Sequence, residues 1–302
     1  MLRAALLIFL SLYSNMLSAQ QHFTHQTDDD DDPYETNSTF TLGMNYLSNN
    51  VYLGRKDSVR IPYFSPYISF KAQNGLYAKA QISYTDVPKK HIDLLTLEGG
   101  YQHSFGDLNT GIAFDKFFYS KKSTSVKANI TGSINLYGMY SNDYVEPLIT
   151  TEMNFGATTD YVLGLAIDHT FFLAEDKLSI IPTVTTFSGT QHYYDQYQIA
   201  RNPNSKKVKK PKAVIAADKF QTLDYELSLP ISYTIKHWVF SLTPVYVLPQ
   251  NPSQITVYKL NGTENTVPEK ISDSFFLELD IAYRIMTGKA NRVNKPRMHS
   301  GY

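Results

Sequence analysis

Apolar and polar side chains alternate along VKANITGSINLYGMY, which spans residues 126–140. Val126, Ile130 and Leu136 fall on one face of this stretch, whereas Lys127 and Asn135 fall on the other. Because successive side chains of a β-strand point to opposite faces, this period of two predicts a strand. The stretch is longer than the ~5–6 residues common in globular sheets and reaches the ~9–11 residues that cross a membrane at a tilt.

The same period recurs along the chain after residue 38, most clearly at residues 220–236 and 274–286. We count twelve runs, which begin near Thr39, Tyr63, Leu76, Ile92, Thr110, Val126, Leu148, Tyr161, Leu178, Phe220, Trp238 and Ser274. The links after even-numbered runs are mostly short, and the long links at residues 49–61, 191–219 and 250–273 all follow odd-numbered runs. This alternation is typical of bacterial outer-membrane barrels, which have short periplasmic turns and longer outer loops.

A sheet whose outward face is apolar satisfies its backbone in lipid only when it closes on itself. We therefore predict an all-β fold, a closed antiparallel up-and-down transmembrane β-barrel of about 12 strands over residues 39–286. A secreted β-sandwich is the alternative, and it would bury Leu227, Leu229 and Ile231 between two layers.

Three consecutive predicted strands contain a proline, which removes a donor from the hydrogen-bond ladder. Pro182, Pro230 and Pro244 are therefore expected to mark one shared kink or bulge. In the last long link, residues 255–260 and 266–267 flank Asn261-Gly262, which predicts a small hairpin above the membrane.

The composition restricts the function. The 302 residues include 28 basic and 28 acidic side chains, so the net charge does not point to nucleic acid as a partner. The chain has no cysteine, which excludes disulfides, a thiol nucleophile, a cysteine zinc site and a lipoprotein anchor. The 23 tyrosines and 17 phenylalanines fit a protein that needs aromatic side chains at two membrane interfaces.

Residues 1–19 are predicted to be a signal peptide, with Arg3, an apolar stretch and a cleavage site after Ala19. Residues 20–38 form a predicted acidic disordered linker, since its five consecutive aspartates repel one another; calcium binding is a weaker alternative, because the run lacks alternating ligands around a glycine turn. Residues 287–302 are predicted to be a basic periplasmic tail.

With this signal peptide, the twelve runs and the loop SNNVYLGR at residues 48–55, the chain resembles uncharacterised outer-membrane β-barrel proteins of Gram-negative bacteria. The resemblance covers residues 39–286 and rests on pattern more than on a diagnostic motif. It implies an integral outer-membrane location and no cofactor, and it assigns no substrate.

If the apolar faces meet lipid, the polar faces line the lumen. The predicted lumen acids are Glu98, Asp115, Glu152, Asp168, Asp224, Glu226, Glu278 and Asp280, and the predicted bases are Lys71, Lys79, Lys127 and Arg284. Two hypotheses follow, and both can hold. In one, these charges pair and fill the barrel as a structural network. In the other, an acid-rich lumen passes small cations and polar solutes.

Other functions remain open at this point. An outer-membrane enzyme that acts on lipid or peptide at the rim would need a catalytic triad there, and Ser188, His192 and Asp195 are the best candidates, although no flanking motif supports them. A receptor or adhesin could use the outer loops. The longest loop carries basic residues that suit phosphates of lipopolysaccharide, although a solvated mobile loop is the simpler interpretation; they are Arg201, Lys206, Lys207, Lys209, Lys210 and Lys212.

The expected partners are outer-membrane lipids, lipopolysaccharide and, during insertion, the barrel-assembly machinery. No catalytic residue, cofactor or metal is expected.

Overall fold

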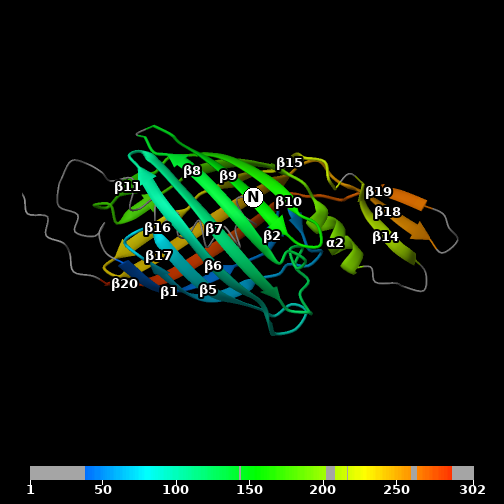
Figure 1. Cartoon of the computed structure of the whole chain (residues 1–302), viewed down its shortest axis with the longest axis horizontal. Coiled ribbons are helices and arrows are strands. Elements are labelled where there is room, and N and C mark those ends of the chain that lie inside the picture. Colours follow the sequence, from blue (N-terminus) through cyan, green and yellow to red (C-terminus); the bar gives the residue numbers. More distant parts are fainter. Residues whose placement is uncertain (1–37, 143, 202–207, 216, 260–263, 288–302) are drawn as a thin grey trace, which may run out of the picture.

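The computed structural model describes residues 38–142, 144–201, 208–215, 217–259 and 264–287 (Figure 1). The predicted signal peptide, most of the predicted acidic linker and nearly all of the predicted tail lie outside these residues. The strands that form the barrel are β1 (Ser38–Leu47), β4 (Tyr63–Lys71), β5 (Leu76–Thr85), β6 (His91–Phe105), β7 (Leu108–Tyr119), β8 (Gly132–Tyr140), β9 (Glu146–Phe155), β10 (Asp160–Asp168) continued by β11 (Phe171–Leu173), β12 (Leu178–Ile180) continued by β13 (Thr183–Gly189), β15 (Gln221–Ser228) continued by β16 (Ile231–Ile235), β17 (Trp238–Pro249) and β20 (Ser274–Thr287).

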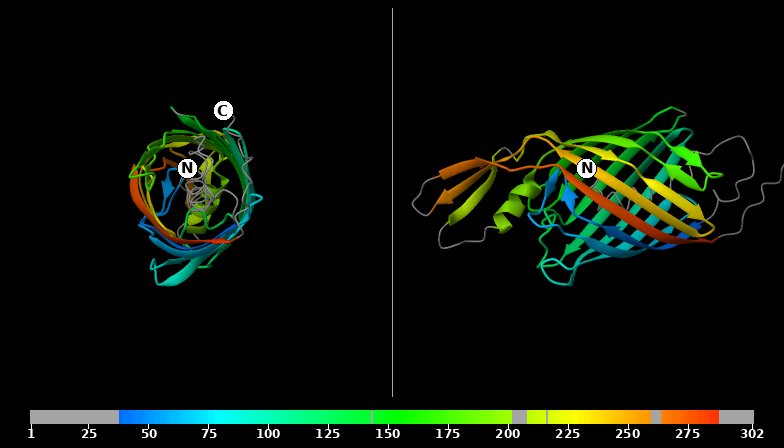
Figure 2. Two further views of the ribbon diagram at one scale, coloured as in Figure 1. Left: turned by 90° about the vertical axis from the view of Figure 1, so that its left-hand side faces the viewer. Right: turned by 180° about the vertical axis from the view of Figure 1, so that it is seen from behind.

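The barrel is closed by its first and last strands. Successive strands of the wall pair antiparallel, and β20 pairs with β17 on one side and with β1 on the other. The β1–β20 register runs from Ser38 opposite Thr287 to Leu47 opposite Glu278, so every residue of β1 pairs across the seam. Figure 2 shows the resulting ring of strands end-on. The predicted closed barrel of twelve strands is confirmed.

The outward face of the barrel is apolar. Leu227 and Leu229 are 46% and 37% exposed, so the alternative of a sandwich that buries these residues is wrong. Exposed aromatic side chains gather near both ends of the strands, as girdles at two membrane interfaces require. One girdle comprises Tyr46, Phe64, Tyr84, Phe118, Tyr161, Phe220, Tyr246 and Phe275, and the other comprises Phe70, Tyr101, Phe105, Tyr140, Phe171, Tyr233, Trp238 and Phe240. Exposed leucine and isoleucine side chains, such as Leu97, Leu136 and Leu165, lie between them.

The girdles also match a membrane in spacing. Trp238 and Tyr246 belong to opposite girdles on the same strand, β17. Their eight-residue separation corresponds to about 26 Å along the strand, or about 20 Å along the membrane normal at a tilt of about 40°, which is close to the ~25 Å apolar band of such barrels. No helix among residues 38–142, 144–201, 208–215, 217–259 and 264–287 is long and apolar enough to span a membrane.

Eleven of the twelve predicted strands begin within two residues of the observed start, and the sixth does not. The strand predicted from Val126 begins at Gly132. Residues 125–130 form turns instead, in which Ala128 and Ile130 donate to the carbonyls of Ser125 and Lys127. Val126 and Ile130 are therefore buried in the interior, and the prediction that they face outward is wrong.

A bulge causes a second exception. The pairing of β13 with β15 shifts between Phe187 and Ser188, which leaves Leu223 without a partner in the register. Leu223 turns inward and is fully buried, although the alternation predicted that it would face outward with Tyr225. An extra residue in one strand reverses the facing of the residues beside it, and the sequence pattern does not show where that happens.

The three strand prolines lie side by side, as predicted. Pro182 interrupts the strand between β12 and β13, and Pro230 interrupts the next one between β15 and β16. Ile181 donates to the carbonyl of Pro230, and Leu229 donates to that of Pro244, with N–O distances of 2.9 and 3.3 Å. The neighbouring strands thus share one irregular line, at which each missing donor is tolerated.

Beyond one end of the barrel, which we call the outer end, the long links form structure of their own (Figure 1). The helix α2 (His192–Arg201) is followed by β14 (Val208–Ile215), and β18 (Gln254–Lys259) and β19 (Glu264–Pro268) form the predicted hairpin. β14 pairs with β18, so the order of this sheet is β14-β18-β19. Lys209, Lys210 and Lys212 therefore belong to a strand and not to an irregular loop.

We expect a charge at the middle of the outward face to destabilise the barrel in lipid. Leu165 lies on β10 between the two girdles and is 47% exposed. Leu165→Arg should lower the free energy of unfolding from lipid vesicles by about 2–4 kcal/mol, the usual cost of arginine at the bilayer midplane. Tyr144→Arg, in an 83% exposed turn, is the matched control and should change it by less than about 0.5 kcal/mol. Equal stability of the two variants in a urea titration would contradict a lipid-facing Leu165.

Candidate functional site

The strands turn a band of charged side chains into the lumen. Every predicted lumen acid is buried on the inward side of its strand: Glu98, Asp115, Glu152, Asp168, Asp224, Glu226, Glu278 and Asp280. Lys79 is buried with them, while Lys71 and Arg284 are partly buried. Lys127 also points inward, but from the link between β7 and β8 and not from the predicted strand.

Cross-strand register brings several of these charges together. Lys79 lies opposite Glu98 on β6, and Glu98 lies opposite Asp115 on β7. Ser133 Oγ and Asn135 Nδ2 donate to Asp115 Oδ2 at 3.0 and 2.8 Å, which satisfies one oxygen of this carboxylate. Like charges directly opposite each other destabilise a sheet, so the pair Glu98–Asp115 needs a cation or a polar partner nearby.

A second group of charges lies around the seam of the barrel. Tyr67 donates its hydroxyl proton to Asp280 at 3.1 Å, and Asn45 donates to Glu278. Lys79 Nζ lies 4.4 Å from the centre of the Tyr67 ring, in cation–π contact. This wall therefore combines acids with bases, whereas the wall with Asp224 and Glu226 on β15 carries acids.

Sequence reasoning missed several inward charges. Asp93, Glu146 and Asp160 are buried acids at or near strand ends, and Arg55 is a buried base in the first outer link. Among the described residues, buried or partly buried inward acids thus outnumber the bases even more than predicted. Asp93, Glu146 and Asp160 lie just outside or at the edge of the alternating runs, so their facing could not be inferred from the period.

The first outer link folds into the barrel. It contains β2 (Val51–Tyr52) and β3 (Arg55–Lys56), which pair as a hairpin that we call the cross-lumen hairpin, Val51–Lys56. Its turn residues Leu53 and Gly54 have φ values of 55° and 70°, as a two-residue type I′ turn requires. Gly54 also approaches the barrel wall closely, because a Cβ there would lie 2.8 Å from Pro249 Cβ.

This hairpin spans the bore from one wall to the other. Ser48, directly after β1, exchanges hydrogen bonds with Leu277 on β20. At the other side, Asn154 Nδ2 on β9 donates to the Tyr52 hydroxyl at 2.9 Å. β9 lies six strands from β1 in the twelve-strand ring, which is the opposite wall. End-on, the hairpin lies inside the ring of strands (Figure 2).

Lys127 supports the hairpin from a third side. Its Nζ lies 4.7 Å from the centre of the Tyr52 ring and 5.4 Å from that of Phe117. Burial lowers the pKa of this ammonium group, while the carboxylates of Glu152 and Asp115 act in the opposite direction.

Arg55 fixes the hairpin to the outer loops. Its guanidinium donates to Gln191 Oε1 at 3.1 Å and to the carbonyl of Asn251 at 3.0 Å, and its Nε lies 3.1 Å from Glu269 Oε2. The side chain is completely buried, and a buried guanidinium is tolerable only when its donors are paired in this way. Arg55 therefore joins its own outer link to the link that contains Gln191 and to the link that contains both Asn251 and Glu269.

Helix α2 lies against the hairpin and begins at a buried carboxylate. Asp160 accepts the backbone N–H groups of His192 and Tyr193 at 2.7 Å each, as a cap supplied by a distant residue. Tyr193 then packs edge-on against Tyr52, with ring centres 4.6 Å apart. The outer end of the lumen is thus a connected unit of hairpin, helix and loops.

Two residues of the predicted catalytic alternative contact residues outside that triad. His192 Nδ1 lies 3.0 Å from Asp160 Oδ1, and Ser188 Oγ lies 3.3 Å from Thr222 Oγ1. A nucleophile, a base and an orienting carboxylate in sequence are required for a triad. Within the described part of the chain, no group of three or more histidine, aspartate and glutamate side chains could hold a metal ion.

No protein-family model and no curated protein matches this chain. Among solved structures, it is similar to a KdgM porin, with 11% identity over 80% of this chain and 98% of that chain and a TM-score of 0.46. It is also similar to a NanC porin, with 12% identity over 81% of this chain and 98% of that chain and a TM-score of 0.45. LpxR from Salmonella typhimurium shows 9% identity over 80% of this chain and 99% of that chain, with a TM-score of 0.42.

We expect Arg55→Ala to release the cross-lumen hairpin. The change leaves Glu269 as a buried carboxylate without its cation, and breaking such a pair typically costs about 3–5 kcal/mol. Hydrogen exchange at the amides of residues 50–56 should become at least about 100-fold faster, whereas exchange in the barrel strands should not change. Lys89→Ala, an exposed lysine of another outer link, is the control. Unchanged exchange in the Arg55 variant would show that the hairpin is held by other contacts.

Proposed function

We propose that the protein is a narrow outer-membrane channel for small cations and polar solutes, with the cross-lumen hairpin as its constriction at the outer end. The observation that carries this proposal is the excess of carboxylates on the inward face of a closed barrel. Rings of acidic side chains favour cations in channels. The hairpin crosses the bore, so we expect it to limit passage to small solutes.

The proposed location follows from the architecture. Closed barrels with an apolar outer band and two aromatic girdles are the form in which β-strands cross bacterial outer membranes. Delivery would use residues 1–19 as a signal peptide that is cleaved before Gln20, and insertion would use the barrel-assembly machinery. The short links and both described chain ends would then face the periplasm, and α2 with β14, β18 and β19 would lie outside the cell.

A structural barrel without conduction is the second candidate, and one observation favours it. Arg55, Lys127 and Tyr52 make an extensive buried network around the hairpin, which is what a closed plug would also require. A conductance measurement in planar bilayers separates the two candidates. A channel produces discrete steps of current, and a sealed barrel produces none.

We expect the acids near the seam to determine the ion preference. In the double variant Glu278→Gln and Asp280→Asn, the lumen loses two negative charges with little change in side-chain size. The reversal potential in a salt gradient should move toward that of a non-selective pore, since fewer carboxylates attract cations. Glu175→Gln, in an exposed turn at the inner end, is the control and should leave the reversal potential unchanged. If the double variant retains full cation preference, or if the protein does not conduct at all, the acidic channel is refuted.

A further inference from the structure

We propose that a groove on the outward wall of the barrel binds one acyl chain of a phosphorylated glycolipid, the lipid A part of lipopolysaccharide. We call it the wall groove; it is lined by Ile134, Leu136, Thr151, Glu152, Met153, Tyr161, Val162, Leu163 and Phe220. This inference rests on the proposed outer-membrane location but not on the proposed conduction.

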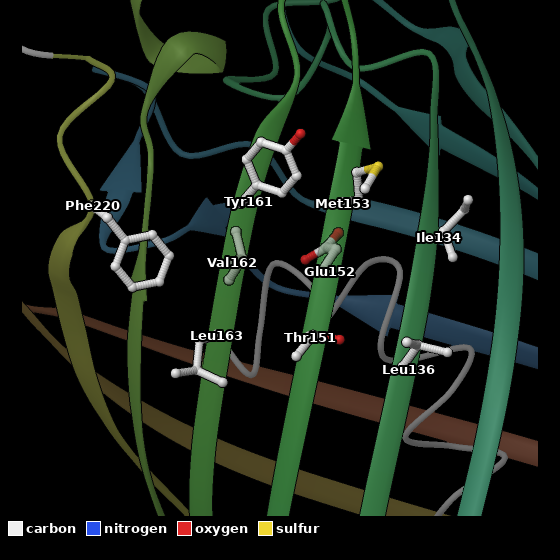
Figure 3. Close-up of a pocket in the computed structure, with 9 residues that line it drawn as sticks. All are labelled: Ile134, Leu136, Thr151, Glu152, Met153, Tyr161, Val162, Leu163 and Phe220. Atoms are coloured by element: carbon white, nitrogen blue, oxygen red, sulfur yellow. The ribbon is translucent and has the colours of Figure 1, made fainter.

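The wall groove is a small hollow formed by neighbouring strands of the barrel. Its volume is about 300 Å³, at the lower end of the ~300–1,000 Å³ of small-molecule sites, and it is open on one side. Its side chains come from the adjacent strands β8, β9 and β10, and the Phe220 ring stands at its flank (Figure 3). Glu152 and Val162 belong to the inward face, so they contribute to the groove from behind the outward side chains.

A short side chain in a row of long ones makes the groove. Register places Leu136, Thr151 and Leu163 side by side across three strands. The next row toward the outer end consists of Ile134, Met153 and Tyr161, which are all longer than threonine. Thr151 is therefore the floor of a hollow between two leucines, and an acyl chain would fill that hollow with apolar contacts.

The position of the groove selects the outer leaflet. Tyr161 follows the first residue of β10, and Ile134 lies two residues from the start of β8. Both strands start at the outer end, so the groove lies in the outer half of the apolar band, beside the girdle residues Tyr161 and Phe220. In a bacterial outer membrane this half faces lipopolysaccharide.

Basic side chains at the outer ends of nearby strands and in their outer links suit an anionic head group. Lys116 is exposed on β7 opposite Gly132, one row beyond Ile134, and its Nζ lies 5.7 Å from the Phe118 ring centre. Lys121 and Lys122 are exposed in the link that follows β7, and Lys219 precedes Phe220 next to the exposed Asp218. Lysines at this level reach the interface and can contact the phosphates of lipid A, which a zwitterionic phospholipid would not match as well.

Binding can be measured by native mass spectrometry of the detergent-solubilised full chain titrated with bis-phosphorylated lipid A. Wild type should retain one lipid A. Thr151→Trp should lower the affinity at least about tenfold by filling the groove, a loss equivalent to about two buried methylene groups. Combined replacement of Lys116, Lys121 and Lys122 by glutamine should lower it about threefold to tenfold. Ala78→Trp, at an exposed outward position on β5, should leave it unchanged.

Three outcomes would overturn the proposal. Equal retention of lipid A by wild type and Thr151→Trp would exclude the groove as the site. Equal loss in Ala78→Trp would show that the effect is a general one of bulk on the wall. Equal affinity for phosphatidylethanolamine would exclude a site that recognises phosphorylated glycolipid. The Thr151→Trp variant should keep the circular dichroism and the bilayer conductance of wild type, so a failure of this inference is distinct from a failure of the proposed channel.

Discussion

The structure depends on one constraint: a strand in hydrocarbon has no water to satisfy its backbone, so each N–H and C=O must pair within the sheet. The seam between β1 and β20 meets this constraint, because residues from Ser38 to Leu47 pair along its whole length. Closure in turn separates two environments. One face of each strand meets lipid and carries leucine, isoleucine and aromatic rings, and the other encloses polar side chains. The closed sheet tolerates the prolines at positions 182, 230 and 244. The interruptions that they cause lie in neighbouring strands, which are joined there by the hydrogen bonds from Ile181 to Pro230 and from Leu229 to Pro244.

Closure leaves a polar lumen, and the chain uses one of its own loops to restrict it. The cross-lumen hairpin is short, and among the strands that the structure describes its two strands pair only with each other. It is positioned by side chains: Tyr52 reaches Asn154 on the opposite wall, and Arg55 joins the loops around Gln191, Asn251 and Glu269. A buried guanidinium with several acceptors is costly to break and specific in geometry, so it suits a part that must hold its place across the lumen.

The sequence predicted the barrel well because lipid imposes the same period of two on every strand. The prediction of which way a side chain faces failed where a turn or a bulge interrupts this alternation. Val126 and Ile130 continue the alternating pattern of the sequence, but turns at residues 125–130 place their side chains in the interior. The prediction placed Leu223 on the outward face because the sequence does not reveal the bulge between β13 and β15. The hairpin was not predicted, although SNNVYLGR contains the turn residue Gly54, because its inward position depends on partners about 75–200 residues away, such as Ser125 and Asn251. The acids of the lumen followed from alternation, whereas Arg55 did not.

Lipid-borne quenching tests the separation of the two faces most directly. The chain has no cysteine, so a fluorophore can be attached to one introduced cysteine at a time. Leu165 faces outward on β10, and Ala166 beside it is 5% exposed and faces inward. In vesicles with brominated acyl chains, a label on Leu165→Cys should be strongly quenched, and a label on Ala166→Cys should be quenched little. Equal quenching at the two adjacent positions would mean that the strand does not separate lipid from an enclosed lumen, and the barrel as described here would be wrong.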